Sequence, residues 1–232
     1  MVCGPLREEW ARIVQAMARI VLLTGFEPFG GETENPSWDA VQGLGDERIE
    51  DHRLVVRRLP CVFGEAIARL EREVAELRPY VVICVGQAGG RAEISVERVA
   101  INLDDARIPD NADAQPLDRP VVTGGPAAYF SSLPVKAIVR DLKAADIPAG
   151  LSHSAGTFVC NHVFYGACHL RARSRRGMRT GFVHIPHSPA QATRHPGSPS
   201  LAVPIVTRAL RIAVATTLRN TADAREVGGA IS

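Results

Sequence analysis

The sequence predicts a single α/β domain, a sandwich in which helices cover both faces of a largely parallel, twisted sheet. Short apolar runs of strand length alternate along the chain with segments whose apolar residues recur at helical spacing. The apolar runs at 19–24 and 80–85 show no polar alternation, and each leads into a glycine-rich loop. Strands that are apolar on both sides are typical of a sheet covered on both faces.

The first half of the chain supplies three of the expected strands and two helices. Residues 19–24 and 80–85 are the two continuous apolar runs, and 52–59 is a further strand candidate between them. A helix is expected over 35–44, because Asn-Pro-Ser is a common helix start and apolar residues then share one face. A second helix is expected over 63–77, where apolar residues recur every three or four positions up to an Arg-Pro pair.

The second half continues the alternation after one long irregular segment. Residues 94–103 are expected to form a strand, and 104–126 a long loop, because this segment holds several prolines and turn residues. The remaining expected elements are a helix over 134–145, a short extended segment over 149–154, a helix over 161–172, a strand over 181–185, a flexible loop over 193–200, and a closing helix over 200–218 despite Pro204.

The chain shows no internal repeat and no linker that would divide it. With 232 residues and a hydrophobic fraction of 46%, it can bury one core. Residues 1–16 are interpreted as an N-terminal extension outside that core, and 17–232 as one catalytic domain.

Charge and cysteine content indicate a cytoplasmic protein that binds neither nucleic acid nor membrane. The formal net charge is only +2, and no apolar stretch is long enough to span a bilayer. Five scattered cysteines without a CxxC do not form a disulfide framework, and charges at Glu8, Glu9 and Arg12 interrupt any signal peptide. Cys84, inside an apolar run, is expected to be a core residue. One basic cluster is interpreted as the solvated end of a helix and the loop after it: Arg171, Arg173, Arg175, Arg176 and Arg179.

A nucleophile candidate lies at a predicted helix start. In the segment SAGTFVCNH (154–162), a turn of small residues leads to Cys160 immediately before the helix. Backbone N–H groups and the helix dipole would lower the pKa of a thiol there and stabilise an oxyanion. The alternative interpretation is a buried structural cysteine.

Two further residues complete a possible triad. His184, in GFVHIP (181–186), ends an apolar strand and is followed by a proline, so it is a candidate base. Glu97 interrupts the apolar alternation of ISVERVAIN (94–102). Because a buried carboxylate needs a partner, Glu97 either pairs with Arg91 or Arg98 or orients the histidine.

Three other functions are alternatives to this interpretation. Cys160, His162, Cys168 and His169, with His184 and His187 further on, raise the possibility of a metal site, but their spacing matches no common zinc pattern. A protein that binds its ligand without turning it over would keep the pocket and lose the triad. A phosphate site at 25–31 or 86–90 is disfavoured, because neither loop fits a nucleotide-binding fingerprint.

Several long motifs in order resemble pyroglutamyl peptidase type I, also called pyrrolidone-carboxylate peptidase, a family of cysteine peptidases. The resemblance covers about residues 19 to 192. It is carried by LLTGFEPFGGETENPSW (22–38), VGQAGGRAEISVERVAINLDDARIPDN (85–111), GPAAYFSSLPVKAIV (125–139), SAGTFVCNHVFYG (154–166) and GFVHIP (181–186).

The resemblance implies both a reaction and its residues. The family removes an N-terminal pyroglutamyl residue from small peptides, without a cofactor or metal, and its catalytic triad falls on Cys160, His184 and Glu97 of this chain. The family's apolar pocket for the pyrrolidone ring falls on Phe26, Phe29, Ile108, Phe158 and Val159, with Gln87 and Asn35 at nearby polar positions and Arg107 close to the site in a role left open. A mostly apolar slot suits this neutral lactam and rejects a charged N-terminus.

The chain also departs from the family's pattern at identifiable places. Residues 1–16 precede the family's usual start, and His187-Ser188 replaces a pair that is usually aromatic or aliphatic, so local packing or subunit contacts are expected to differ. By resemblance the protein is expected to be a homo-oligomer, a tetramer in the family.

Overall fold

The computed structural model describes residues 19–174 and 177–229, and the predicted extension 1–16 lies outside these described residues. Along the chain the elements are β1 (Arg19–Phe26), α2 (Pro36–Gln42), β2 (Arg48–Ile49), β3 (His52–Leu59), α3 (Glu65–Leu77), β4 (Val81–Gln87), β5 (Ile94–Glu97), β6 (Val99–Ile101), β7 (Ala128–Phe130), α4 (Val135–Ala144), β8 (Ala149–Ser152), α5 (Val159–Arg173), β9 (Arg179–Ile185), α6 (Pro189–Ala192) and α7 (Val203–Arg219).

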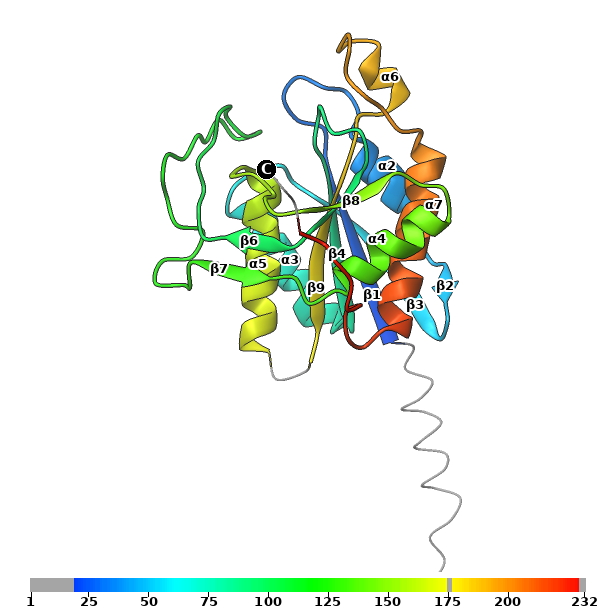
Figure 1. Cartoon of the computed structure of the whole chain (residues 1–232). Helices are drawn as coiled ribbons and strands as arrows, with labels where there is room; N and C mark the ends of the chain where they lie inside the picture. Colours follow the sequence, from blue (N-terminus) through cyan, green and yellow to red (C-terminus); the bar gives the residue numbers. More distant parts are fainter. Residues whose placement is uncertain (1–18, 175–176, 230–232) are drawn as a thin grey trace, which may run out of the picture.

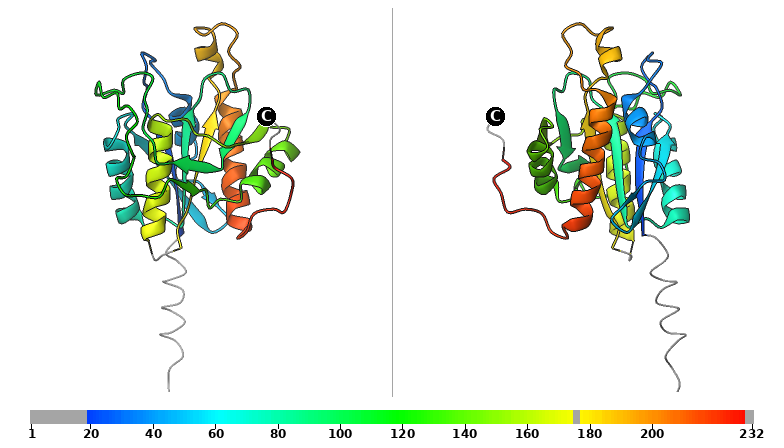
Figure 2. Two further views of the ribbon diagram at one scale, coloured as in Figure 1. Left: turned by 60° about the vertical axis from the view of Figure 1, so that its left-hand side comes forward. Right: turned by 90° about the vertical axis from the view of Figure 1, so that its right-hand side faces the viewer.

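The predicted α/β sandwich is confirmed. A seven-stranded sheet of order β2-β3-β1-β4-β9-β5-β8 forms the middle layer, with α3 and α5 on one face and α2, α4 and α7 on the other (Figure 1). The side views show the same three layers (Figure 2). Alternate residues of the central strands enter the two separate cores, which explains why these strands are apolar on both sides.

The central strands of the sheet are parallel, and the outer strands run in the opposite direction. Strands β3, β1, β4 and β9 are parallel. Strand β2 runs antiparallel to β3, and β5 runs antiparallel to β9 and parallel to the edge strand β8. The connection from β4 to β5, residues 88–93, contains no helix. A parallel crossover needs about a dozen residues or more, so the chain returns beside the parallel strands in the opposite direction.

One predicted strand is wrong in its extent. The expected strand 94–103 divides at Arg98 into β5, which belongs to the large sheet, and β6, which pairs with β7 in a separate two-stranded sheet. The side chain of Asn161 holds β6 in place, since it accepts from the Ile101 N–H and donates to the Ile101 and Leu103 carbonyls. Strands β2 and β7 and the short helix α6 were not predicted from the sequence.

Two helix details follow from local chemistry. Asn35 begins α2, and its side chain accepts from the N–H of Ser37. The closing helix begins at Val203, so Pro204 lies in the first turn, where its missing N–H costs no helical hydrogen bond.

The predicted basic cluster divides into two environments. Arg171 and Arg173 lie in the last turn of α5, as expected for cations near a helix C-terminus. Arg179 instead donates to the carbonyls of Thr217 and Asn220 at the end of α7, while 175 and 176 lie outside the described residues. Among the helices that the structure describes, none is long and apolar enough to cross a membrane.

Candidate active site

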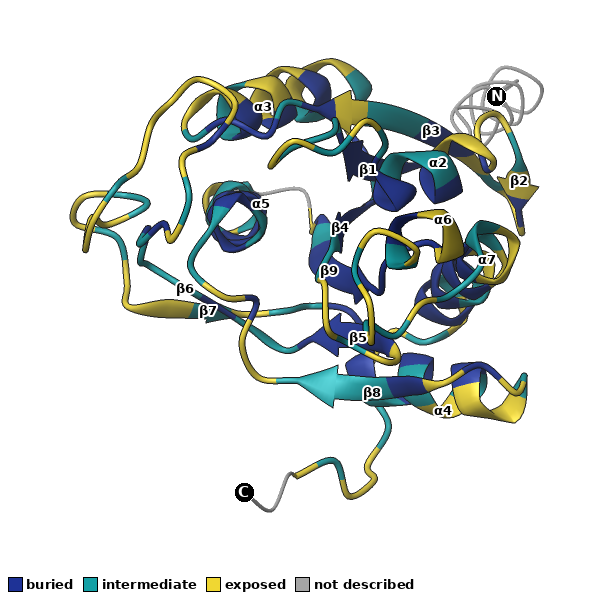
Figure 3. Ribbon diagram, turned by 90° about the horizontal axis from the view of Figure 1, so that it is seen from above, coloured by how far each residue is buried: buried dark blue, intermediate teal, exposed yellow. Residues whose placement is uncertain are grey.

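A cavity of about 310 Å³ opens at the end of the sheet where the parallel strands finish. Figure 3 looks down on this end of the molecule. The lining residues come from the ends of β4 and β9, the start of α5, and loops that follow β1, β4, β6 and β8. They are Phe29, Gln87, Ala88, Arg91, Asp105, Arg107, Ile108, Ala155, Gly156, Thr157, Phe158, Cys160 and His184.

The pairing of two antiparallel strands brings His184 to Glu97. Ser95 lies opposite His184 across β5 and β9, so Glu97, two residues further along β5, shares its face of the sheet and is a diagonal neighbour. Nδ1 of His184 is 2.7 Å from Oε1 of Glu97, and both side chains are almost completely buried. Because Nδ1 is engaged by the carboxylate, Nε2 is the nitrogen available to a reacting group in the cavity.

Arg91 binds the same carboxylate oxygen. Its Nη1 donates to Oε1 of Glu97 over 2.8 Å, and its Nη2 donates to the carbonyl of Ser154 over 3.0 Å. The sequence left open whether Glu97 pairs with an arginine or orients the histidine. Both interactions are present, because Oε1 of Glu97 contacts the imidazole of His184 and the guanidinium of Arg91. The Ser154 contact also ties Arg91 to the loop that leads to Cys160.

Cys160 is held at the first turn of α5, on the sheet face that carries His184. Gly86 of β4 pairs with His184 across the sheet and lies beneath the thiol. A Cβ at Gly86 would be 2.7 Å from the sulfur of Cys160 and 2.8 Å from the ring of Phe182, so only glycine leaves room for the thiol. The loop before the helix is fixed by Thr157, whose Oγ1 donates to the Asp105 carbonyl and whose carbonyl accepts from the Asp105 N–H.

Burial dominates the electrostatics of the thiol and the imidazole. Desolvation raises the pKa of the Cys160 thiol well above its ordinary value, and neighbouring Cys61 and Glu97 act in the same direction. Desolvation also lowers the pKa of His184, against the opposing effect of its hydrogen bond to Glu97. The direction for the thiol is opposite to that expected from the helix start, because desolvation acts against the thiolate. Both shifts favour a neutral thiol and a neutral imidazole over the ion pair.

Four of the seven predicted pocket residues line the cavity: Phe29, Gln87, Ile108 and Phe158. The loop arginine Arg107 lines it as well. The rings of Phe29 and Phe158 lie 6.0 Å apart, and Phe63 packs edge-on against Phe158 from behind. These side chains give the cavity its aromatic wall.

Three predicted pocket residues lie elsewhere. Phe26 and Val159 are buried in the core between the sheet and α5, Phe26 because it is the last residue of β1 and points to that face against Phe182. Asn35 is 2% exposed and acts on the loop instead, since its amide donates to the Glu27 carbonyl. It thereby supports the turn that carries Phe29.

Sequence reasoning did not place Arg91, Asp105 or the turn Ala155–Gly156–Thr157 in the cavity wall. The turn directly precedes the helix start that carries the candidate nucleophile. Its position next to Cys160 in the sequence was the signal available for it.

The residues considered for a metal site have other partners. His162 bonds to Asp104, His169 to the hydroxyl of Tyr129, and Cys168 to Thr180. Within 19–174 and 177–229 no group of three His, Cys, Asp or Glu side chains is placed to hold a metal ion. Cys84 is completely buried, which confirms it as a core residue.

An α/β sandwich with a thiol, an imidazole and a carboxylate gathered at the ends of its strands has the arrangement of a cysteine hydrolase. The family model described as pyroglutamyl peptidase matches residues 19–220. The chain belongs to the pyroglutamyl peptidase family.

Similar proteins agree in sequence and in structure. The pyrrolidone-carboxylate peptidase of Cupriavidus necator is 61% identical over 212 residues, which cover 91% of this chain and 98% of that protein. The crystal structure of pyroglutamyl peptidase I from Bacillus amyloliquefaciens matches with a TM-score of 0.88 and 46% identity, covering 90% of this chain and 100% of that one. A mutant pyrrolidone carboxyl peptidase from Pyrococcus furiosus matches with a TM-score of 0.85 and 41% identity, covering 87% and 99%.

Proposed function

We propose that this protein removes the N-terminal pyroglutamyl residue from peptides, with Cys160 as nucleophile, His184 as general base and acid, and Glu97 as the group that orients His184. The observation that carries the proposal is the shared cavity: Cys160 and His184 line it together, and Glu97 holds Nδ1 of His184 from behind. Membership of the pyroglutamyl peptidase family supports the choice of substrate.

The reaction begins from the neutral pair. Nε2 of His184 takes the proton of the Cys160 thiol as the sulfur attacks the pyroglutamyl carbonyl, so thiolate and imidazolium form only as the bond is made. Glu97 stabilises the imidazolium through Nδ1, as a buried carboxylate does in hydrolytic triads. The imidazolium then protonates the departing amine, and the C–N bond breaks to leave a thioester.

Water completes the cycle. His184 accepts a proton from a water molecule that attacks the thioester, and the C–S bond breaks to release pyroglutamate and restore the Cys160 thiol. In both halves the carbonyl oxygen becomes negative. The N–H groups of the first turn of α5 have no intrahelical partners and are suited to stabilise that charge.

Selectivity follows from the composition of the cavity. Phe29, Ile108 and Phe158 offer apolar surface to a flat lactam ring, and Gln87 offers a donor and an acceptor. An ordinary N-terminal residue would bring an ammonium group against this apolar surface, where its lost hydration is not replaced.

Hydrolysis of a pyroglutamyl-amide reporter, before and after treatment with iodoacetamide, tests the proposal. We expect turnover that is abolished by alkylation and equally by Cys160→Ser, with circular dichroism unchanged. Turnover that survives both would refute Cys160 as the nucleophile. Binding of pyroglutamate without any release of the reporter amine would instead identify a binding protein.

We also propose a cytoplasmic homo-oligomer that acts on small peptides and binds neither nucleic acid nor membrane. The free cysteines Cys61, Cys84, Cys160 and Cys168 suit a reducing compartment. Leu117 and Phe130 are 74% and 69% exposed, and apolar side chains in such positions favour self-association. Light scattering at several protein concentrations tests the oligomer, and a monomer throughout would refute it.

A further inference from the structure

A polar network lies behind one wall of the cavity, where Gln87 meets the segment after β9. Gln87 is the last residue of β4 and lines the cavity. Its carboxamide contacts two side chains of that segment, Gln191 and His187, which are 0% and 8% exposed. From the sequence, His187 is a departure from the family's pattern and one of the residues considered for a metal site, and Gln191 has no predicted role.

Backbone groups fix the side chain of Gln191 at both ends. Its Oε1 accepts from the N–H of Ser188 over 3.2 Å, within a capping box at the start of α6. Its Nε2 donates to the carbonyl of Glu34 over 3.4 Å. A backbone N–H only donates and a carbonyl only accepts, so the amide of Gln191 has one satisfied orientation.

The orientation of Gln191 determines that of Gln87. Nε2 of Gln191 also donates to Gln87 over 3.0 Å, and the atom that receives it is Oε1 of Gln87. The amide nitrogen of Gln87 therefore faces the other way, toward Nδ1 of His187 at 2.9 Å. An N–H donor requires an acceptor, and Nδ1 of His187, which also lies 3.4 Å from Oε1 of Gln191, is placed to accept in the tautomer that carries its proton on Nε2.

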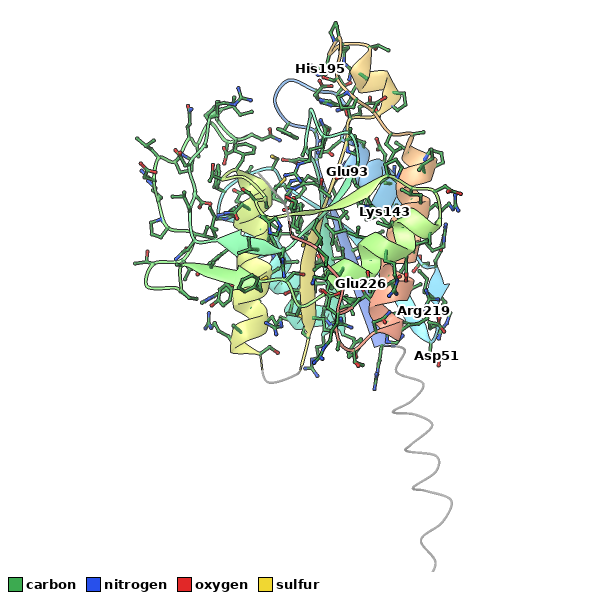
Figure 4. The ribbon with its side chains drawn as sticks, in the orientation of Figure 1. Asp51, Glu93, Lys143, His195, Arg219 and Glu226 are labelled. Carbon is green, nitrogen blue, oxygen red and sulfur yellow. The ribbon has the colours of Figure 1, made fainter. Side chains whose placement is uncertain are left out.

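Contacts with the backbone keep the His187 ring in place. Its Nε2 lies against Gly89, where a Cβ would clash with it, while the half-exposed side chain of His195 covers the ring with centroids 4.7 Å apart. Its carbonyl accepts from the N–H of Leu201. Figure 4 shows His195 at the top of the molecule, above the ends of the parallel strands.

We propose that His187 and Gln191 are positioning residues that hold the carboxamide of Gln87 in a single orientation at the cavity, and thereby set the affinity for the lactam. This inference rests on the proposed function of the cavity. After its contacts to His187 and Gln191, the Gln87 amide retains one N–H and one acceptor lone pair. A lactam carries one acceptor, its carbonyl, and one donor, its N–H. A reversed Gln87 amide would turn its oxygen toward the lactam carbonyl and its N–H toward the lactam N–H.

The test is a set of variants measured for KM and kcat with the pyroglutamyl-amide reporter. His187→Leu keeps the bulk of the ring but removes the acceptor, and Gln191→Met keeps the length of the side chain but removes the donor. Each should raise KM about tenfold, the effect of losing a hydrogen bond between buried neutral groups, and leave kcat within about twofold. His187→Asn, whose Oδ1 falls near the position of Nδ1, should restore most of the affinity.

His195→Asn is the matched control. It removes the stacking on His187 and the contact of His195 to Glu32, but it leaves Nδ1 of His187 facing Gln87. KM should therefore stay within about twofold of the parent value. If His187→Leu and His187→Asn give the same KM, or if the loss appears in kcat alone, the positioning role is overturned.

A second readout separates this inference from the assignment of the nucleophile. The rate of Cys160 alkylation by iodoacetamide in the absence of substrate should be unchanged in His187→Leu, because the thiol and its histidine are untouched. If Gln191→Met unfolds, the comparison of His187→Leu with His187→Asn decides the question alone. Failure of Cys160→Ser to abolish turnover would refute the proposed function and not the network.

Discussion

Two buried histidine–carboxylate pairs of the structure are similar in geometry and differ in their surroundings. His184 contacts Glu97 over 2.7 Å, and His162 contacts Asp104 over 2.8 Å; all four side chains are buried, and each carboxylate has one oxygen without a partner. In both pairs the carboxylate engages Nδ1. The difference lies at Nε2.

The second nitrogen of each ring has a different neighbour. Nε2 of His162 accepts from the backbone N–H of Gly64 over 2.9 Å, so the ring joins α5 to the start of α3 and both nitrogens are used. His184 lines the cavity beside Cys160, and its Nε2 is left for chemistry. We therefore expect a buried histidine–carboxylate pair to serve catalysis or structure according to what its remaining nitrogen meets.

The largest expected effect separates the two histidines by activity. His184→Gln should lower kcat/KM by about 10⁴-fold, because general acid and base catalysis is lost at both steps, while the melting temperature changes little. Steady-state kinetics with the reporter and thermal denaturation measure both quantities. A residual rate within tenfold of the parent would show that the nitrogen facing the cavity is not the base.

The approach of the thiol to that nitrogen depends on Gly86. Gly86→Ala places a methyl group 2.7 Å from the sulfur and should lower kcat/KM about 10²-fold, the cost of a displacement of about 1 Å in a reacting group. Gly229→Ala, at a glycine with no atom within 4 Å of the added Cβ, is the matched control. Equal activity of the two variants would contradict the close packing of Cys160 on β4.

The carboxylate should matter less than the imidazole. Glu97→Gln should lower kcat/KM about 10- to 100-fold, less than His184→Ala, because Arg91 still donates to Oε1 and keeps that oxygen toward Nδ1. Adding Arg91→Met should deepen the loss, since the amide is then free to turn its nitrogen to the histidine. If Glu97→Gln lowers kcat/KM as much as His184→Ala does, the role of Glu97 extends beyond orienting His184.

The pH profile tests the protonation state of the resting pair. Only neutral His184 can accept the proton of the thiol, and burial lowers the pKa of His184 below the ordinary 6.5. We therefore expect kcat/KM to remain high at pH 6.5 and to fall only as the pH drops through that lowered pKa. Burial raises the pKa of Cys160 above 9.0, so no thiolate absorption should be present at neutral pH. A thiolate signal at neutral pH that disappears in Cys160→Ser would contradict a neutral pair.

The smallest effect on activity is expected at the other histidine. His162→Leu leaves Asp104 and the Gly64 N–H without their partner and should lower the free energy of unfolding by about 2–4 kcal/mol. The folded fraction should keep kcat within about tenfold, since Nε2 of His162 does not reach the cavity chemistry. Urea denaturation measures the free energy of unfolding, and steady-state kinetics corrected by active-site titration measure kcat of the folded fraction. Complete loss of turnover in folded His162→Leu would contradict the purely structural role of His162.

The sequence predicted the fold where periodicity is strong. The strand at 80–85 and the helix at 63–77 were recognised because one lacks polar residues and the other repeats apolar residues at helical spacing. The break at Arg98 was not recognised, because both halves of 94–103 are equally apolar and the boundary is set by Asn161, about 60 residues away. The direction of β5 likewise depends on a connection path that periodicity does not encode.

The candidate site was likewise predictable from the sequence only in part. Cys160, His184 and Glu97 stand out because polar or reactive residues interrupt apolar elements, and the resemblance to a family supplied their roles. Phe26 and Phe29 look equivalent in GFEPFG, yet one ends a buried strand and the other lies in the cavity wall. Arg91 and the orientation of the Gln87 amide depend on contacts between segments far apart in the sequence, which no local pattern predicts.

The most direct test of the central claim is mass spectrometry of the enzyme quenched in acid during turnover of a pyroglutamyl ester or amide. Cys160 should carry one pyroglutamyl group in the parent protein, and the modification should be absent in Cys160→Ser. A pyroglutamyl group on Cys61, Cys84 or any other residue, or rapid turnover by Cys160→Ala, would contradict the proposed mechanism.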